Sequence, residues 1–303
     1  MNRRKFLQDV FLWSAGLSVS IPHFTIAEAV VAQPASPLVA LAEGSDYGEL
    51  VEKVMSSLGG MGKFVRPGDK VVVKPNIGWD RTPEQAANTH PLVVRAIVEQ
   101  CLEMGAGRVH VFDRTCNEKR RSYKNSGIID SLKSLKNRKV RYDHIDKRKF
   151  VPVDIERGKS LTRYEIYGDV LEADCYINVP IAKHHSISRL TLGLKNSMGV
   201  IGGNRGRLHH DLAQNLADLA TVIQPKLTIV DATRMLLRNG PQGGRLEDVK
   251  IANTLIASRD PVAADAYATT LFGLLPEDIG STVAAHGMGL GEMDINKMRI
   301  VKL

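Results

Sequence analysis

Residues 70–113 read KVVVKPNIGWDRTPEQAANTHPLVVRAIVEQCLEMGAGRVHVFD, and this stretch decides the fold class. It starts with a short strand of β-branched residues over 70–74. An amphipathic helix follows over 91–104 and ends at Gly105, and a second apolar strand covers 108–113. A strand, a helix and a strand in this order favour a βαβ unit, in which the two strands lie parallel in one sheet.

The rest of the chain repeats this alternation. Apolar periodicity predicts helices over 47–58, 123–135, 208–223 and 260–272, and strands over 139–142, 173–180, 226–231, 251–257 and, at a sheet edge, 296–303. A polar, Lys- and Arg-rich β segment over 147–169 interrupts the pattern. We therefore expect an α/β fold with a mostly parallel or mixed sheet, helices on both faces, and a smaller inserted β segment.

Composition limits the classes of function. The 303 residues are 43% hydrophobic and 24% charged, which excludes a disordered, collagen-like or coiled-coil chain. Lys and Arg outnumber Asp and Glu by 41 to 33, which gives a formal net charge of +8. This excess favours a small anionic molecule or an anionic surface as the binding partner. Because the basic residues form no dense stripe and no nucleic-acid-binding motif is present, we expect no nucleic-acid partner.

The N-terminus resembles a twin-arginine export signal. The sequence RRKFL at 3–7 is followed by an uncharged apolar stretch over 10–26 and by a small-x-small cleavage site, AEA, at 27–29. A basic membrane anchor that is never cleaved is the alternative. In both cases the protein would be periplasmic or otherwise exported, with the twin-arginine translocation machinery as a partner. The resemblance implies that the protein crosses the membrane already folded, as cargo that often loads a cofactor or assembles before export.

The predicted domain boundaries follow from this signal. Residues 1–29 would be the signal peptide, and the Ala-, Pro- and Ser-rich residues 30–48 would be a linker. Residues 49–303 would form a single α/β domain, in which 144–170 are a candidate inserted subdomain.

Polar side chains follow four of the predicted strands, at the edge where open α/β sheets bind their ligands. The residues at these strand ends are Lys74, Asn76, Asp113, Asn178, Lys183, His184 and Asp231. Any single one of them is also explained by ordinary turn chemistry. Polar side chains at four strand ends that converge predict a shared crevice between these ends.

The helix over 91–104 begins next to Thr89 and His90. Their side chains could face an anion at the helix N-terminus, where free N–H groups and the positive end of the helix dipole lie. The alternative is a simple cap, with Pro91 at the first helical position, and the two interpretations are compatible.

The segment 183–199 has the most unusual pattern in the chain. It places two histidines and two lysines on a turn and the start of a predicted helix, within an otherwise apolar stretch. A buried Lys195 beside Asn196 would need an anionic partner, whereas a Lys195 that reaches solvent would not. The Gly-rich stretch 202–207 could add backbone N–H groups and Arg205 to an anion site, and a flexible lid is its alternative.

The histidine pairs at 184–185 and 209–210 are candidate metal ligands. Neutral imidazole together with carboxylate oxygen suits a divalent transition metal. Adjacent histidines on one element cannot both point inward, so at most one of each pair would bind. The predicted set is Asp113, Asp231 and His209, and the alternative for the histidines is capping or anion binding. With three cysteines and no C-x-x-C spacing, we expect no intrinsic iron–sulfur cluster.

These residues have predicted roles. The candidate catalytic residues are His184, His90, Lys183 and Lys195, with an imidazole as the general acid or base and the lysines stabilising negative charge. The candidate ligand-binding residues are Lys74, Asn76, Thr89, Asn178, Asn196 and Arg205. Asp113 and Asp231 would orient a histidine or complete the metal shell.

Taken together, several motifs resemble those of the domain of unknown function 362 family. They are Lys74-Pro75-Asn76, Thr89-His90-Pro91, Asp113, Asn178-Val179-Pro180 with Lys183-His184, Leu194-Lys195-Asn196 with Gly199, 225–231, Asn239-Gly240-Pro241 and 260–266. The resemblance covers about residues 65–290. It implies no particular reaction, and the cysteine-rich ferredoxin-like module of many members is missing here. The first two motifs are also distantly similar to the nickel-dependent lactate racemase superfamily, whose members act on 2-hydroxy acids.

The predicted function combines these observations. We expect an exported α/β protein whose cationic His/Lys crevice binds a small anionic ligand together with a metal or organic cofactor. The alternative is a non-catalytic periplasmic factor that binds a cofactor or metal, or assists its maturation, for a redox partner.

Overall fold

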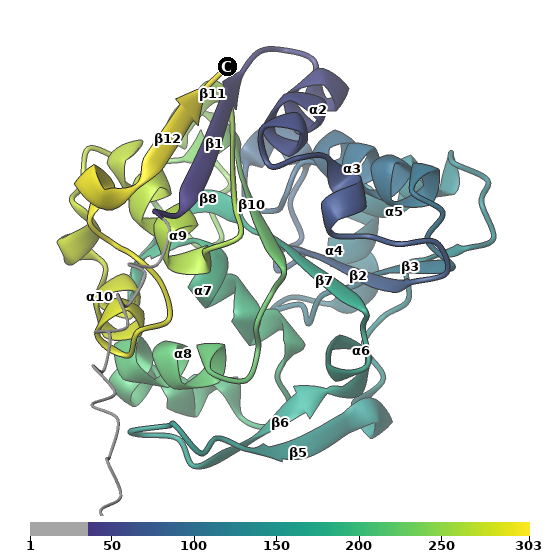
Figure 1. Ribbon diagram of the computed structural model, residues 1–303. Helices are drawn as coiled ribbons and strands as arrows, with labels where there is room; N and C mark the ends of the chain where they lie inside the picture. Colours follow the sequence, from purple (N-terminus) through teal and green to yellow (C-terminus); the bar gives the residue numbers. More distant parts are fainter. Residues whose placement is uncertain (1–35) are drawn as a thin grey trace, which may run out of the picture. The chain divides into compact units, whose positions relative to one another are not determined.

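The structure, a computed structural model, describes residues 36–303, and a twisted mixed β-sheet runs through this part of the chain (Figure 1). The strand order is β12-β1-β11-β10-β7-β2-β3-β4. Outside this order, β8 pairs with β10, and β9 pairs with β8. The strands are β1 (Leu38–Glu43), β2 (Lys70–Pro75), β3 (Arg108–Val111), β4 (Val140–Arg141), β7 (Cys175–Val179), β8 (Ile181–His185), β9 (Arg189–Thr191), β10 (Leu227–Leu236), β11 (Val249–Ser258) and β12 (Arg299–Lys302). The strands from β10 to β4 run parallel, whereas β11 is antiparallel to both of its neighbours.

Helices cover both faces of this sheet, so the predicted fold class is confirmed. They are α2 (Tyr47–Ser57), α3 (Pro91–Glu103), α4 (Lys119–Asn125), α5 (Ile128–Lys133), α6 (Gly168–Leu171), α7 (Gly193–Asn196), α8 (Leu212–Ala220), α9 (Pro261–Thr270) and α10 (Gly280–Gly287). The alternation of side chains along β2 shows why both faces are apolar. Val71 and Val73 pack in the cluster that contains residues of α2, α3 and α5, whereas Val72 packs in the cluster that contains residues of α8.

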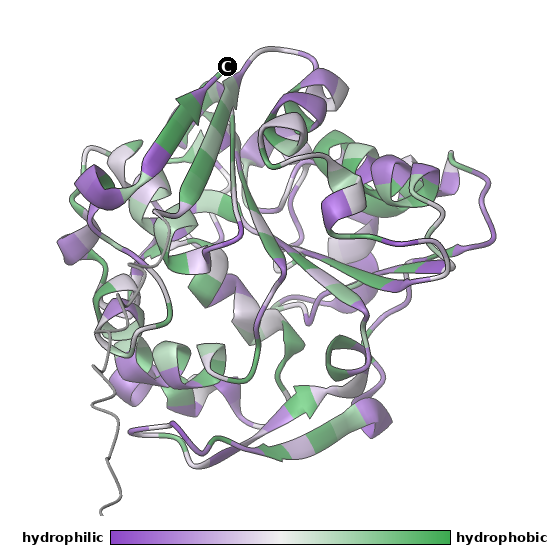
Figure 2. Cartoon of the chain, in the orientation of Figure 1, coloured by the Kyte–Doolittle hydropathy of each residue, from purple (hydrophilic) through white to green (hydrophobic). Residues whose placement is uncertain are grey.

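Figure 2 shows that the apolar residues concentrate on the strands and on the helix faces that meet them. The core is built mostly from aliphatic side chains, as expected for a chain in which only 5% of the residues are aromatic. A third cluster, on the α9 side, joins β1, β10 and β11 to α9 through small residues such as Ala263 and Ala266. These three clusters hold the sheet rigid and fix the ends of its strands.

A separate antiparallel pair lies within 144–170, the candidate inserted subdomain. It consists of β5 (Phe150–Asp154) and β6 (Arg163–Tyr167), a two-stranded sheet of its own. Ile166 and Tyr167 pack with α8 residues in one apolar cluster, so the pair shares the core of the main domain. The polar β segment predicted from the sequence is this pair.

Three local predictions differ from the structure. The predicted linker over 30–48 is wrong for residues 38–43, because β1 pairs with β11 and β12 and its Val39, Ala40 and Ala42 are fully buried. The single helix predicted over 123–135 is two helices, because Gly127 adopts a positive φ of 73° between α4 and α5. The segment after residue 183 forms the β8–β9 hairpin before α7, where a turn and a helix start were expected.

The predicted signal peptide over 1–29 and residues 30–35 of the predicted linker lie outside the described residues. Within 36–303, no helix has the length and apolar character that crossing a membrane requires.

Candidate functional site

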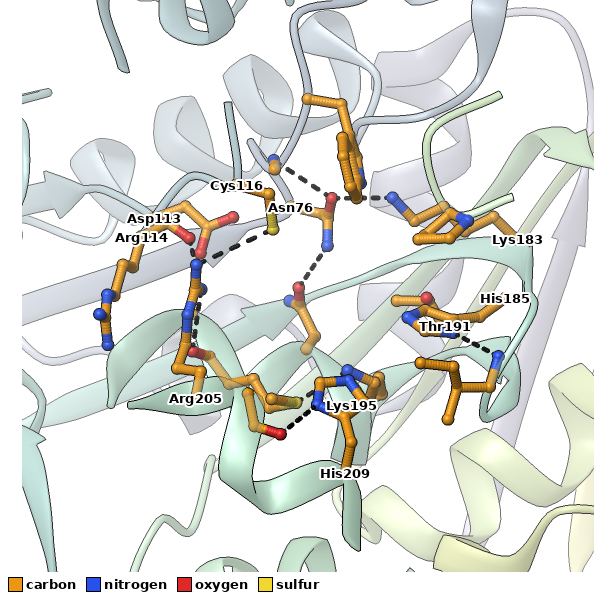
Figure 3. Close-up of a pocket in the computed structure, with 18 of the residues that line it drawn as sticks. Asn76, Asp113, Arg114, Cys116, Lys183, His185, Thr191, Lys195, Arg205 and His209 are labelled. Carbon is orange, nitrogen blue, oxygen red and sulfur yellow. Dashed lines mark hydrogen bonds between the residues drawn. The ribbon is translucent and has the colours of Figure 1, made fainter. Parts of the chain in front are cut away.

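A cavity of about 550 Å³ opens at the carboxyl ends of β2 and β3, beside the β8–β9 hairpin and α7 (Figure 3). Eight residues predicted from the sequence line it: Lys74, Asn76, Asp113, Lys183, Lys195, Asn196, Arg205 and His209. Its described lining contains five Lys or Arg side chains and one carboxylate, that of Asp113. The converging strand ends therefore form a cationic cavity of a size that suits a small molecule.

Lys74 and Asp113 form a buried ion pair at one wall of the cavity. The Nζ of Lys74 lies 2.9 Å from Oδ1 of Asp113 and donates a hydrogen bond of 2.7 Å to Oδ1 of Asn196. Burial lowers the pKa of Lys74, and the Asp113 carboxylate opposes this shift. Gly199 is required here, because a Cβ at this position would overlap Asp113 Oδ1 and the end of the Lys74 side chain. Lys74 therefore has its counterion within the protein.

Lys183 is buried to the same degree but has no carboxylate partner in the described chain. Its Nζ donates to the backbone oxygen of Ala87 and, over 3.2 Å, to Oδ1 of Asn76, and it lies 6.0 Å from the centre of the Trp79 ring. Only 1% of the residue is exposed. Burial lowers the pKa of Lys183 to about 7, so the neutral amine and the ammonium are both accessible near neutral pH.

Lys195 is the second lysine without a carboxylate partner in residues 36–303. It lies on α7, and its Nζ contacts the Met198 sulfur at 2.8 Å. Burial is the largest cause that lowers the pKa of Lys195 to about 8, and the positive charges of Arg205 and Lys74 add to it. Lys195 is partly exposed, so the structure lies between the buried lysine and the solvent-reaching lysine that the sequence left open.

Arg205 holds the loop that closes one side of the cavity. Its guanidinium donates to the backbone oxygens of Arg114 at 2.7 Å and Thr115 at 2.9 Å, and it lies 3.8 Å from the Cys116 sulfur. Because these oxygens are neutral, the positive charge of Arg205 is not cancelled. The Gly-rich stretch predicted as a lid or an anion site is therefore tied to the strand end after β3.

A ladder of three asparagines fixes the strand ends relative to α7. Asn76 Nδ2 donates to Asn196 Oδ1 at 3.0 Å, Asn196 Nδ2 donates to Asn178 Oδ1 at 2.8 Å, and Asn178 Nδ2 donates to the Gly193 oxygen at 2.9 Å. Asn178 lies behind the cavity wall and does not line it. It positions Asn196 and is not placed to contact a ligand.

Thr89, His90 and Asp231 also lie outside the cavity lining, and each satisfies a local need of the fold. Thr89 Oγ1 donates to the Val179 oxygen at 2.7 Å. His90 caps α3 by accepting from the Leu92 N–H, and its ring stacks on Tyr47. Asp231 accepts the N–H of His90 at 2.7 Å. His90 is therefore the cap of α3, whereas Thr89, whose Oγ1 also accepts the N–H of Asn76 at 2.8 Å, ties two strand ends together and does not cap the helix.

The sequence predicted His184 as the catalytic histidine, but the histidine that lines the cavity is His185. His184 Nδ1 accepts the N–H of Gly240 at 3.1 Å, and the ring does not line the cavity. His185 lines it, as Figure 3 shows beside Thr191. Successive residues of β8 point to opposite faces, so only one of the two histidines can face the cavity. Sequence periodicity limited the choice to one of the pair but could not identify the face.

The predicted metal set is not assembled. Asp113 is paired with Lys74, Asp231 is held by His90 and Thr233, and only Asp113 and His209 line the cavity. Within 36–303, no group of three His, Cys, Asp or Glu side chains is arranged to hold a metal ion. The prediction of a metal bound by Asp113, Asp231 and His209 is therefore wrong, because the carboxylates already have partners inside the fold.

Sequence reasoning did not single out Trp79, Cys116 or Thr191, which line the cavity, and it named His185 only as one of a pair of candidate metal ligands. Cys116 is exposed and lies three residues after Asp113. Its position just beyond a strand end was the signal that could have identified it. Thr191 had no such signal, because only the pairing of β9 with β8 brings it to the cavity.

Comparison with known protein families supports the resemblance found in the sequence. The family model described as "Domain of unknown function (DUF362)" matches residues 71–270. The chain belongs to this family. The matched region contains every residue that lines the cavity, together with Asn178 behind its wall.

Individual relatives are more distant. The thylakoid-associated protein sll1697 of Synechocystis sp. is 28% identical over 253 residues, which are 78% of this chain and 73% of that protein. A solved structure from Thermotoga maritima has a TM-score of 0.49 at 14% identity. The superposition covers 77% of this chain and 60% of the Thermotoga chain. The lactate racemase apoprotein of Thermoanaerobacterium thermosaccharolyticum has a TM-score of 0.43 at 10% identity. The superposition covers 73% of this chain and 54% of the racemase chain. Neither structural similarity carries an argument about activity.

Proposed function

We propose that the protein binds, and acts on, a small molecule that carries a carboxylate or phosphate group in the cavity described above. One observation carries this proposal: Lys183 is buried and Lys195 is partly buried beside the cavity, and within the described residues their ammonium groups meet only neutral partners. A buried ammonium without a counterion is costly, and an anionic ligand would remove that cost.

The remaining lining fits the same ligand class. Arg205 and Arg114 add positive charge at the far side of the cavity, while the single carboxylate is occupied by Lys74. The net positive field would attract an anion and favour its binding over that of a neutral analogue. The volume of about 550 Å³ suits a small metabolite and excludes a polymer as the buried ligand.

For the enzyme form of this proposal, we assign proton transfer to Lys183, and no longer to His184 or His90. A general acid or base works best with a pKa near the working pH, and the pKa of Lys183 is lowered to about 7. Lys195 and Arg205 would hold the anionic group. Lys74 would keep its partner Asp113 and support the cavity wall.

We further propose that the protein is exported by the twin-arginine route, from the RRKFL sequence at 3–7 and the apolar stretch that follows it. The competing function is that of a non-catalytic carrier for a redox partner. An organic anion is the form of cofactor that suits this cavity, because the predicted metal ligands are engaged elsewhere. A carrier would bind its ligand unchanged, whereas an enzyme would return a product.

Titration calorimetry tests the proposed binding with inorganic phosphate and small carboxylates as probes. Replacing Lys195 by Met removes one ammonium group at nearly constant volume, and we expect affinity to fall by roughly tenfold to a hundredfold, because charged hydrogen bonds contribute about 1.5–3 kcal/mol. Lys70→Met is the matched control, since Lys70 is exposed at the other end of β2 from Lys74. Equal affinity in the wild type and in Lys195→Met would overturn the proposal.

A further inference from the structure

One face of the β8–β9 hairpin presents three polar side chains to the cavity. Lys183 and His185 are two residues apart on β8 and so point the same way. Thr191 on β9 is the register partner of Lys183 in the antiparallel pair, which places both side chains on the same face. All three line the cavity.

His185 is held as a neutral imidazole with its proton on Nε2. Its Nδ1 accepts hydrogen bonds from the backbone N–H groups of Ile187 at 3.1 Å and Ser188 at 3.3 Å, so this nitrogen carries no proton. Burial lowers the pKa of His185 to about 3, and the charges of Lys195, Lys183, His209 and His184 act in the same direction. The free Nε2–H is therefore a neutral donor across the working pH range.

Thr191 adds a hydroxyl that has no partner in the described chain. The residue is 4% exposed, and its Oγ1 is buried without a hydrogen bond. A buried hydroxyl left unpaired costs free energy, so its place on the cavity wall points to a polar group of the ligand. Figure 3 labels both His185 and Thr191 among the residues that line the cavity.

Lys183 has one position of its tetrahedral nitrogen left for the ligand. In the neutral amine, the two N–H groups suffice for the Ala87 oxygen and Asn76 Oδ1. The lone pair then occupies a remaining position. The hairpin face therefore combines a proton acceptor with two uncharged donors.

We propose that this face binds an uncharged carbonyl group of the anionic ligand and that Lys183 removes a proton from the carbon next to that carbonyl. The inference rests on the proposed function, because Lys195 and Arg205 must hold the anionic group of the same molecule. In the step, the C–H bond breaks, its proton goes to the Lys183 amine, and its electron pair forms the C=C bond of an enolate while the carbonyl π pair moves to oxygen. Return of the proton to carbon from the Lys183 ammonium completes the exchange without an external oxidant or reductant.

Because His185 is neutral, this subsite favours a carbonyl group of the ligand over a second carboxylate group. A second carboxylate would place a full negative charge against two neutral donors, which only partly compensate its loss of water. A carbonyl oxygen needs hydrogen bonds but no counterion in the ground state. As the enolate forms, negative charge develops on that oxygen, and fixed donors aimed at it stabilise the transition state.

The test uses small probes that differ only in the carbonyl group. These are 2-oxopentanoate and 4-oxopentanoate against pentanoate, and acetonyl phosphate against propyl phosphate. Calorimetry measures their affinities, and proton NMR in D₂O measures deuterium uptake at the carbon beside the carbonyl, corrected for uptake without protein. The variants are His185→Leu, His185→Gln and Lys183→Met, with His210→Leu as the control, because His210 is exposed and does not line the cavity.

We expect the wild type and His210→Leu to bind at least one carbonyl probe roughly tenfold more tightly than its match, the gain of about one net hydrogen bond, and to catalyse its deuterium uptake. His185→Leu should lose this preference, and His185→Gln should keep most of it, because the glutamine amide supplies a neutral donor. Lys183→Met should keep the preference and lose the uptake.

Any of the following results would overturn the inference. If all probes bind with Lys195-dependent affinity but the carbonyl brings no gain, the carbonyl subsite is wrong while the anion site stands. If uptake is unchanged in Lys183→Met, Lys183 is not the group that removes the proton. If no anionic probe binds, or binding does not depend on Lys195, the proposed function fails together with the inference.

Discussion

The lowered pKa of Lys183 predicts how the stability of the protein depends on pH. Burial holds the pKa of this lysine at about 7, while in the unfolded chain it returns to about 10.4. Between these values the unfolded state binds one proton that the folded state does not bind. Lys183 therefore raises the free energy of unfolding as pH rises from about 7 to about 10.5. Below pH 7 both states bind the proton, so this gain in stability is absent.

The magnitude follows from one proton. One pH unit corresponds to about 1.4 kcal/mol, so between pH 7.5 and 9.5 Lys183 alone raises the free energy of unfolding by about 2.5 kcal/mol as an upper value. Lys183→Met removes this contribution, because a methionine fills the same buried space without a proton to lose. Lys195 stays in both proteins, so its own contribution cancels in the comparison.

The assay is urea unfolding of the ligand-free protein, followed by circular dichroism at pH 7.5 and 9.5. We expect the wild type to gain about 2.5 kcal/mol more than Lys183→Met over this interval. The exposed-site control Lys70→Met should follow the wild type. Parallel pH curves for the wild type and Lys183→Met would refute the reasoning, because they would show that the buried amine keeps an ordinary pKa.

Three other changes test the cavity and the export signal. Asp113→Asn leaves the buried Lys74 ammonium without its counterion and should cost about 3–5 kcal/mol in urea unfolding; a double variant that also carries Lys74→Met should recover part of the loss, and no recovery would contradict the pairing. Gly199→Ala places a methyl group against Asp113 Oδ1 and Lys74, so we expect about 1–3 kcal/mol of destabilisation and weaker phosphate binding, and wild-type stability would argue against this contact. Changing Arg3 and Arg4 together to Lys should leave the precursor in the cytoplasm on cell fractionation, and unchanged export would exclude the twin-arginine route.

The fold could be predicted well because its signals are local. The β-branched run at 70–74, the amphipathic helix ending at Gly105 and the Asp260-Pro261 helix start each appear at the predicted place, in β2, α3 and α9. The prediction failed where pairing across the sheet overrides composition. The stretch containing β1 is Ala-rich and was expected to be a linker, yet β11 and β12 on either side of it supply the hydrogen-bond partners that make it a strand.

The candidate site could be predicted only in part, for the same reason. Strand-end polarity correctly brought together Lys74, Asp113 and Lys183. It could not say that Asp231 turns to the N–H of His90, nor that β8 directs His185 and not His184 to the cavity. These outcomes depend on register and on which face of a strand is buried, and a single sequence does not fix either of them.

The central claim is that Lys183 and Lys195 bind an anion in a shared cavity. Lysine side-chain NMR with ¹³C at Cε, recorded from pH 6 to 11 with and without saturating inorganic phosphate, tests it most directly, with Lys183→Met and Lys195→Met to assign the signals. We predict two lysines that titrate with pKa values near 7 and near 8 in the free protein, both of which shift to higher pKa when phosphate is bound. If every lysine titrates near 10.5, or if phosphate leaves these two unmoved, the account is contradicted.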